Sequence, residues 1–96
     1  MRSYRLIVAY DGSQLEGWQR QPDRRTVQGE LEAAWSRVTG ESLTITGSGR
    51  TDSGVHALAQ LASLSSATVL TPYRLQGALN AHLPDDIRVR EVAYAK

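Results

Sequence analysis

Arg50 and Asp52 stand two residues apart in the stretch GSGRTDSGVHA, residues 47 to 57. A guanidinium close to a carboxylate lowers the pKa of that carboxyl group and keeps it ionised at neutral pH, ready to act as a nucleophile, a base or a charge partner. Surface turns also collect glycine, serine and aspartate, because glycine tolerates positive φ and aspartate can bond its own backbone. The stretch therefore predicts either an anionic site at Asp52 or an ordinary surface turn.

Other kinds of chemistry find less support in the same stretch. It has neither the G-x-G-x-x-G spacing of a dinucleotide-binding loop nor the Gly-Lys-Ser/Thr ending of a P-loop. Ser53 and His56 are near Asp52 in sequence only, so a serine-type triad does not follow, and we expect His56 to form a structural hydrogen bond at a strand start. The chain has no cysteine and its two histidines lack a ligand spacing, which predicts that no metal is bound.

Arginines form the second group of candidates. Lys and Arg together number 11, and the only lysine is the last residue, although the net charge is only +1. The planar guanidinium binds phosphate with paired hydrogen bonds and stacks on bases in ways that an ammonium cannot. Arg20, Arg24 and Arg25 crowd one loop, which predicts phosphate contacts there. The alternative is that these three side chains are solvated or paired with carboxylates.

Hydrophobic periodicity predicts the elements that would position these residues. Residues 4–10 are apolar on both faces, as in a central strand. Apolar residues then recur at three- and four-residue spacing from Thr26, an expected N-cap, to Gly40, which predicts an amphipathic helix. Residues 43–46 alternate between apolar and polar, and 56–64 have the pattern of a buried strand. We expect these two strands to pair antiparallel across the glycine-rich turn.

The last third of the chain repeats the pattern of helix and strand. Thr71 followed by Pro72 predicts a helix start, since proline at the first helical position lacks only an N–H that would have no partner there. A second proline ends this helix, and residues 86–95 return to a period of two. The apolar phase slips within this strand, which predicts a bulge near Arg90 or Glu91.

The resulting order, β-α-β-β-α-β, predicts an α+β, ferredoxin-like fold with a four-stranded antiparallel sheet and both helices on one face. At this length, residues 1–96 are expected to form a single domain. The absence of cysteine, of a leader peptide and of an apolar run long enough to span a bilayer predicts a cytoplasmic protein with no membrane partner.

Four segments together resemble one family. They are YDGSQLEGWQRQ at 10–21, TVQGELEAA at 26–34, GSGRTDSGVHA at 47–57 and ALNAHLPDDIRV at 78–89. In this order they are similar to the motifs of the tRNA pseudouridine synthase A family, and they span nearly the whole chain. Four ordered motifs are far more specific than one glycine-rich loop.

The resemblance implies isomerisation of uridine to pseudouridine in the anticodon stem-loop of transfer RNA, just 3′ of the anticodon, without a cofactor or metal. Asp52 would be catalytic: it adds to the substrate nucleotide or takes a proton from its ribose while the N-glycosidic bond breaks, and the uracil rejoins through C5. Arg50 would hold Asp52 and help to fill the space of the extruded base. The other substrate-binding residues implied are Thr51, His56, Arg20, Arg24 and Arg25.

Two departures from the family bear on this expectation. Leu15 stands where the family usually has an aromatic residue, a change that affects loop packing. Family members are also much longer, with a second related domain that completes the cleft. Residues 1–96 are therefore expected to resemble the N-terminal catalytic half and to be inactive by themselves, whereas the full-length protein would be a homodimer that binds transfer RNA.

Two other classes of protein remain as alternatives. A noncatalytic RNA-binding module of the RRM type has the same order of elements, but it stacks bases on sheet aromatics, and this chain has no phenylalanine. A ferredoxin-like regulatory domain that binds a small molecule would explain the fold and the glycine-rich turn. It would leave the arginine bias and the four ordered motifs without a reason.

Overall fold

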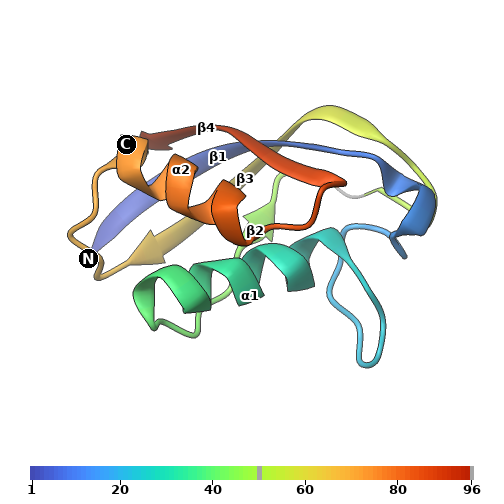
Figure 1. Cartoon of the computed structure of the whole chain (residues 1–96), viewed down its shortest axis with the longest axis horizontal. Helices are drawn as coiled ribbons and strands as arrows, with labels where there is room; N and C mark the ends of the chain where they lie inside the picture. Colours follow the sequence, from blue (N-terminus) through green and yellow to red (C-terminus); the bar gives the residue numbers. More distant parts are fainter. Residues whose placement is uncertain (50, 96) are drawn as a thin grey trace.

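The computed structural model describes residues 1–49 and 51–95, and its four strands form one antiparallel sheet (Figure 1). The elements, in chain order, are β1 (Arg2–Tyr10), a short 3-10 helix η1 (Gly12–Gln14), α1 (Val27–Thr39), β2 (Thr46–Gly47), β3 (Ala57–Ser66), α2 (Pro72–His82) and β4 (Ile87–Tyr94). The sheet order is β2-β3-β1-β4. This arrangement confirms the α+β, ferredoxin-like prediction.

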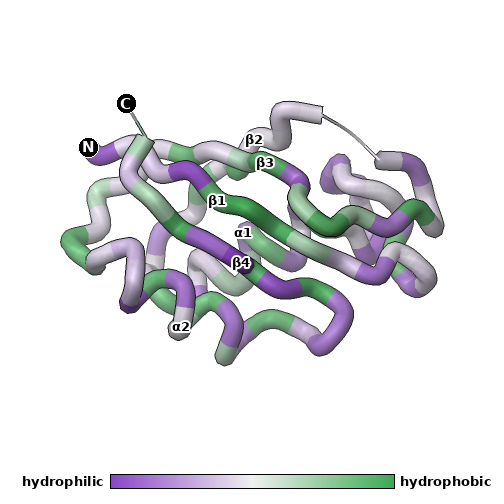
Figure 2. Tube along the Cα trace, turned by 90° about the horizontal axis from the view of Figure 1, so that it is seen from above, coloured by the Kyte–Doolittle hydropathy of each residue, from purple (hydrophilic) through white to green (hydrophobic). Residues whose placement is uncertain are grey.

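Both helices lie on one side of the sheet, and the alternation along β1 explains why (Figure 1). Tyr4, Leu6, Val8 and Tyr10 are buried beneath the helices, whereas the residues between them are exposed or half-buried on the other face. Successive side chains of a strand point to opposite faces, so one apolar row is enough to attach the helix layer. The opposite face carries no helix in the described part of the chain (Figure 2).

The helix boundaries confirm the predicted caps. The Thr26 side chain accepts a hydrogen bond from the Gly29 amide, and Gly40 ends α1 with a left-handed φ of 80°. The Thr71 side chain accepts from the Arg74 amide, and Pro72 is the first residue of α2. These caps satisfy amide groups that have no partner inside the helix, which is why a short polar side chain precedes each first turn.

The strand predicted over 43–46 is wrong in extent, because the structure has only Thr46–Gly47 in β2. Ile45 is buried, but its amide donates to the Glu32 carboxylate of α1 at 2.9 Å instead of joining the ladder with β3. The Glu32 carboxylate also accepts from Gln28 at 3.0 Å. A buried carboxylate needs such donors, and the strand is shortened to provide one.

The predicted bulge in the last strand is confirmed. Ile7 pairs with Glu91 and the next β1 residue, Val8, pairs with Val89, so Arg90 is the extra residue. Val89 and Val92 are three residues apart, so in a regular strand they would point to opposite faces of the sheet. Because of the extra residue, both point to the same face and are buried in the core. No helix in the described ranges has the length and apolarity needed to cross a membrane.

Candidate active site

The loop that carries Asp52 is fastened to the segment that follows β1. Glu16 and Ser53 form an antiparallel bridge between the two. The Trp18 amide donates to the Thr51 carbonyl at 3.1 Å, and the Gly54 amide donates to the Leu15 carbonyl at 3.1 Å. Hydrogen bonds on both sides of Asp52 therefore restrain the backbone that presents it.

Two glycines in the segment after β1 permit this close contact. A Cβ on Gly12 would lie 2.0 Å from the Val55 carbonyl oxygen, which is far inside van der Waals contact. Gly17 has a φ of +86°, and its Cβ would lie 2.9 Å from the Thr51 carbonyl oxygen. Only glycine fits such positions without moving the neighbouring backbone. Both glycines belong to the segment 10–21, whose sequence pattern does not reveal this packing role.

Thr51 is held from the sheet side. The hydroxyl groups of Tyr10, the last residue of β1, and Thr51 lie 2.7 Å apart in a hydrogen bond. The Tyr10 ring is buried, so it forms a fixed support under the loop. The structure thus gives Thr51 an intramolecular partner, and its predicted contact with substrate stays a prediction.

Asp52 itself is exposed. It lines a hollow of about 320 Å³ together with Glu16, Gln19, Gln21, Arg24, Thr51 and Ser53. Among the described residues, none donates a side-chain hydrogen bond to the Asp52 carboxylate, while its backbone carbonyl accepts from the Val55 amide at 3.2 Å. Arg50 and its predicted pairing with Asp52 lie outside the described residues.

Of the three arginines predicted to contact phosphate, only Arg24 lines the Asp52 hollow. Its guanidinium lies 2.6 Å from the Glu16 carboxylate, and both side chains are partly exposed. Arg20 is paired with the buried Glu32 carboxylate at 2.5 Å. These two pairs follow the alternative given for the loop, in which carboxylates are the partners.

Arg25 is the most constrained of the three arginines. Two of its nitrogens approach the two carboxylate oxygens of Asp86 at 2.7 and 2.6 Å, and Glu30 lies 3.6 Å away. The hydrogen bond from Arg25 holds the pKa of Asp86 below its ordinary value, and the pKa of Arg25 is raised in turn. Arg25 therefore joins the loop before α1 to the turn before β4, which is a structural task.

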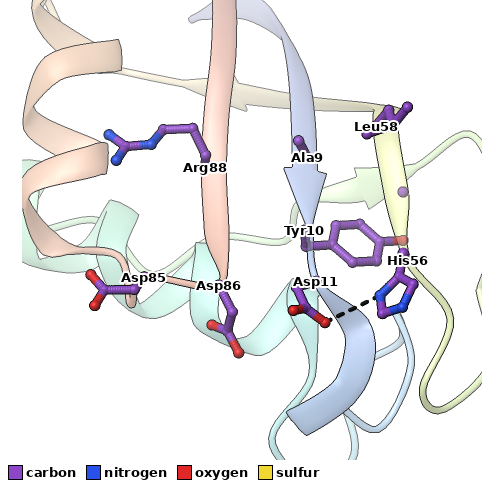
Figure 3. A pocket seen from close by; sticks show the side chains of 9 residues that line it. Ala9, Tyr10, Asp11, His56, Leu58, Asp85, Asp86 and Arg88 are labelled. Carbon is purple, nitrogen blue, oxygen red and sulfur yellow. Dashed lines mark ion pairs between the residues drawn. The ribbon is translucent and has the colours of Figure 1, made fainter.

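His56 lies beside Asp11 at the end of β1 (Figure 3). The Gly12 amide donates to His56 Nδ1 at 2.8 Å, so this nitrogen carries a lone pair and the ring proton is on Nε2. The 3.2 Å contact between Nδ1 and the Asp11 carboxylate becomes an ion pair only on protonation, which would break the bond from Gly12. The structure supports the expected structural hydrogen bond of His56.

Asp11 caps the short helix η1. Its carboxylate accepts from the Ser13 hydroxyl at 2.6 Å and from the Ser13 amide at 3.0 Å. These hydrogen bonds lower the pKa of Asp11, with a smaller contribution from His56. The two carboxylates near this loop thus differ in their hydrogen bonds. Asp11 accepts two from Ser13, whereas Asp52 accepts none from a side chain among the described residues.

Together these features define a ferredoxin-like α+β domain that presents one exposed aspartate on a doubly fastened loop at the end of its sheet. Residues 6–95 match the tRNA pseudouridine synthase family, to which this chain belongs.

Individual relatives agree with this assignment. The chain is 51% identical over 89 residues to tRNA pseudouridine synthase A of Maridesulfovibrio salexigens, which covers 93% of this chain and 33% of that protein. It is 44% identical over 93 residues to tRNA pseudouridine synthase A of Caldicellulosiruptor saccharolyticus, covering 97% of this chain and 38% of the relative. For the enzyme of Brevibacillus brevis the identity is 48% over 92 residues, covering 96% and 38%. The chain therefore spans about a third of the length of the curated relatives that it matches.

Proposed function

We propose that this chain carries the catalytic aspartate of an enzyme that isomerises uridine to pseudouridine in the anticodon stem-loop of transfer RNA. The observation that supports this proposal most strongly is the position of Asp52 in a member of this family. Its carboxylate is exposed on a loop whose backbone is hydrogen-bonded to Glu16, Trp18 and Leu15. An exposed position suits a base that must leave its stack before a side chain can reach it. We also propose that the enzyme works in the cytoplasm without a cofactor.

The reaction needs an anion beside the ribose. Asp52 either forms a bond to the substrate nucleotide or takes a proton from the ribose as the bond between C1′ and N1 breaks. The freed uracil turns and C5 forms the new bond to C1′, while the bond to Asp52 breaks or the ribose proton is returned. N1 gains a proton. The hydrogen of C5 leaves as a proton, so atoms balance without an oxidant or a reductant.

The loss of the C5 hydrogen provides the test of this proposal. A chimera in which these residues replace the matching third of the Maridesulfovibrio salexigens enzyme is assayed for tritium release from transfer RNA labelled at C5 of uridine. We expect Asp52→Asn to reduce turnover by about a hundredfold or more, because the amide keeps the size but removes the anion. Tritium release by this variant at the unmodified rate would contradict the assignment.

Asp11→Asn provides the matched control. Asparagine also caps a first turn well, and among the described residues the Asp11 carboxylate accepts hydrogen bonds from Ser13 and contacts His56. We expect this variant to retain most of the turnover. A loss as large as that of Asp52→Asn would mean that tritium release reports on loop folding and not on the Asp52 anion.

The uncovered sheet face favours catalysis over an RRM-type module. On this face β1 contributes Arg5, Ile7 and Ala9, and β3 contributes Leu61 and Ser63 as cross-strand neighbours of Ile7 and Arg5. None of these is aromatic, whereas an RRM stacks bases on aromatic side chains at such positions. RNA recognition through stacked bases on this face therefore has no support from these residues.

The same proposal covers the oligomeric state and the substrate contacts of the full-length protein. By resemblance, the full-length protein is a homodimer, and Arg50, Thr51 and Arg24 contact the substrate around Asp52. Arg24 has the best geometric support, because it lines the Asp52 hollow and its partner Glu16 is itself partly exposed. Light scattering on the full-length protein tests the homodimer, and a monomer would exclude it.

A further inference from the structure

A second hollow lies between α2 and β4. It has a volume of about 520 Å³ and shares no lining residue with the Asp52 hollow. Its lining is Tyr73, Arg74, Gln76, Gly77, Asn80 and Ala81 from α2 and Arg88 from β4. Two arginines and an exposed aromatic ring therefore meet at one surface depression that the proposed chemistry does not use.

No described ion pair compensates the charge of this hollow, although Arg88 also lines a neighbouring hollow of about 510 Å³ together with Asp11, Asp85 and Asp86. No acidic residue appears in the lining of the α2–β4 hollow, and neither Arg74 nor Arg88 forms an ion pair with a described carboxylate. Arg88 extends from β4 toward α2, away from Asp85 and Asp86 (Figure 3). By contrast, Arg20, Arg24 and Arg25 all have carboxylate partners. Arg74 and Arg88 are thus two arginines without a described carboxylate partner that line the same hollow.

Hydrogen bonds hold the two walls of the hollow in register. The Asn80 side chain donates to the Val89 carbonyl at 2.9 Å and accepts from the Val89 amide at 2.8 Å. Gln76 donates to the Arg90 carbonyl at 3.1 Å. These contacts occupy backbone groups at the outer edge of β4, so α2 and β4 present their arginines from a rigid frame.

Tyr73 adds a stacking surface. Its side chain is 87% exposed in the first turn of α2, although tyrosine rings usually bury much of their area. Along β4, hydrophilic and hydrophobic residues alternate (Figure 2), and Arg88 is on the exposed side of this alternation. A ring beside guanidinium groups matches unpaired RNA, in which phosphates meet arginine and bases stack on aromatic side chains.

We propose that this hollow is a second RNA-binding site, where Arg74 and Arg88 bind a backbone phosphate of the substrate RNA and Tyr73 stacks on an adjacent unpaired nucleotide. The inference rests on the proposed function for the identity of the RNA. It gives the α2–β4 edge a phosphate contact of the kind predicted for the loop of Arg20, Arg24 and Arg25, and it leaves the proposed substrate contact of Arg24 beside Asp52 in place.

The first test is direct binding of a fluorescent transfer RNA transcript to the 96-residue chain, measured by anisotropy over a range of salt concentrations. We expect Arg74→Gln/Arg88→Gln to weaken binding about tenfold or more. The slope of log K against log salt should become shallower by about 0.7 to 0.9, because one phosphate fewer is neutralised. The control Arg2→Gln/Arg37→Gln removes two charges elsewhere and should leave the slope nearly unchanged. An unchanged slope in the first variant overturns the proposal.

A second variant tests the hollow by adding a charge to it. A Cβ on Gly77 would have no neighbour within 4 Å, so Gly77→Glu places a carboxylate in the lining without a clash. We expect Gly77→Glu to weaken binding and Gly77→Gln, its uncharged counterpart, to bind as the unmodified chain does. Equal binding by these two variants would exclude an anion site here.

Turnover separates this proposal from the proposed function. In the chimera, Arg74→Gln/Arg88→Gln should raise KM about tenfold and leave kcat unchanged, whereas Asp52→Asn should lower kcat. If KM does not change while tritium is released normally, the hollow has no role and the proposed function stands. If the unmodified chimera releases no tritium, the proposed function fails, and the anisotropy measurements still decide the RNA site.

Discussion

The chemistry proposed for Asp52 depends on residues that support its loop from behind. Its loop reaches the correct place because Gly12 and Gly17 leave room for the Val55 and Thr51 carbonyls. The Tyr10 hydroxyl then holds Thr51. A carboxylate needs such support because a displacement of about 1 Å at a catalytic group can cost about a hundredfold in rate. Support from several residues also makes the site sensitive to small changes behind the loop.

Gly12→Ala tests this support at the scale of one residue. The added methyl group would lie 2.0 Å from the Val55 carbonyl oxygen, so the backbone after Asp52 must move. We expect tritium release by the chimera to fall by up to about a hundredfold, with a loss of about 1–3 kcal/mol in the free energy of unfolding. Gly77→Ala, where no atom lies within 4 Å, should instead stabilise the helix by about 1 kcal/mol. Unchanged turnover in Gly12→Ala would refute the supporting role of this contact.

At the scale of elements, ion pairs of the loop before α1 connect parts of the fold that are distant in sequence. Arg20 reaches Glu32 of α1, and Arg25 reaches Asp86 in the turn before β4. The Asp11 amide also donates to the Asp86 carbonyl at 2.9 Å. The end of β1, the start of β4 and the start of α1 are thereby held together next to the Asp52 loop.

The Arg25–Asp86 pair predicts a specific dependence of stability on pH. The hydrogen bond from Arg25 lowers the pKa of Asp86 in the folded protein below its ordinary value of 3.8. The pair therefore stabilises the fold fully above pH 3.8, and this stabilisation is lost as the pH falls through the folded-state pKa of Asp86. We expect Asp86→Asn to reduce the free energy of unfolding at neutral pH and to flatten its fall below pH 3.8. Urea unfolding across this range is the measurement. Identical acid slopes in both proteins would show that the pair does not couple to folding.

At the scale of the whole molecule, the described residues have the dimensions of a folded domain. The radius of gyration is 12.2 Å, and a compact chain of this length has about 12.5 Å. Yet Asp52 is exposed in its hollow of about 320 Å³. Exclusion of water and fixation of a sugar need surfaces on more than one side of the reacting atoms. Folding and catalysis therefore have different requirements.

We expect residues 1–96 by themselves to fold but to release no tritium from labelled transfer RNA. Circular dichroism should show the mixed α+β structure, and the uncovered face with Ile7, Leu58 and Leu61 should favour self-association at high concentration. Tritium release at a rate near that of the chimera would show that the present residues suffice. A disordered spectrum would contradict an independently folding domain.

Most elements could be predicted from the sequence because their signals are local. Thr26 and Gly40 cap α1 as expected, and the phase slip predicted a bulge near Arg90 or Glu91, which the structure has at Arg90. The predicted extent of the strand over 43–46 was wrong, because the Ile45 amide donates to the Glu32 carboxylate of α1. No local sequence pattern reveals this hydrogen bond. Propensity and periodicity describe a segment, but they do not identify a donor or acceptor contributed by a distant one.

The sequence by itself therefore determined the order of elements, the family and the residue types around Asp52. Only the tertiary structure decided which side chains are committed to one another. Arg25 and Asp86 are 61 residues apart, and Tyr10 and Thr51 are 41 apart. Such pairs form because the fold brings the end of β1 next to the start of β4 and next to the loop before β3, and each pair gives a side chain a partner that its neighbours in sequence do not reveal. The unpaired arginines of the α2–β4 hollow became visible for the same reason: availability is a property of neighbours in space and not in sequence.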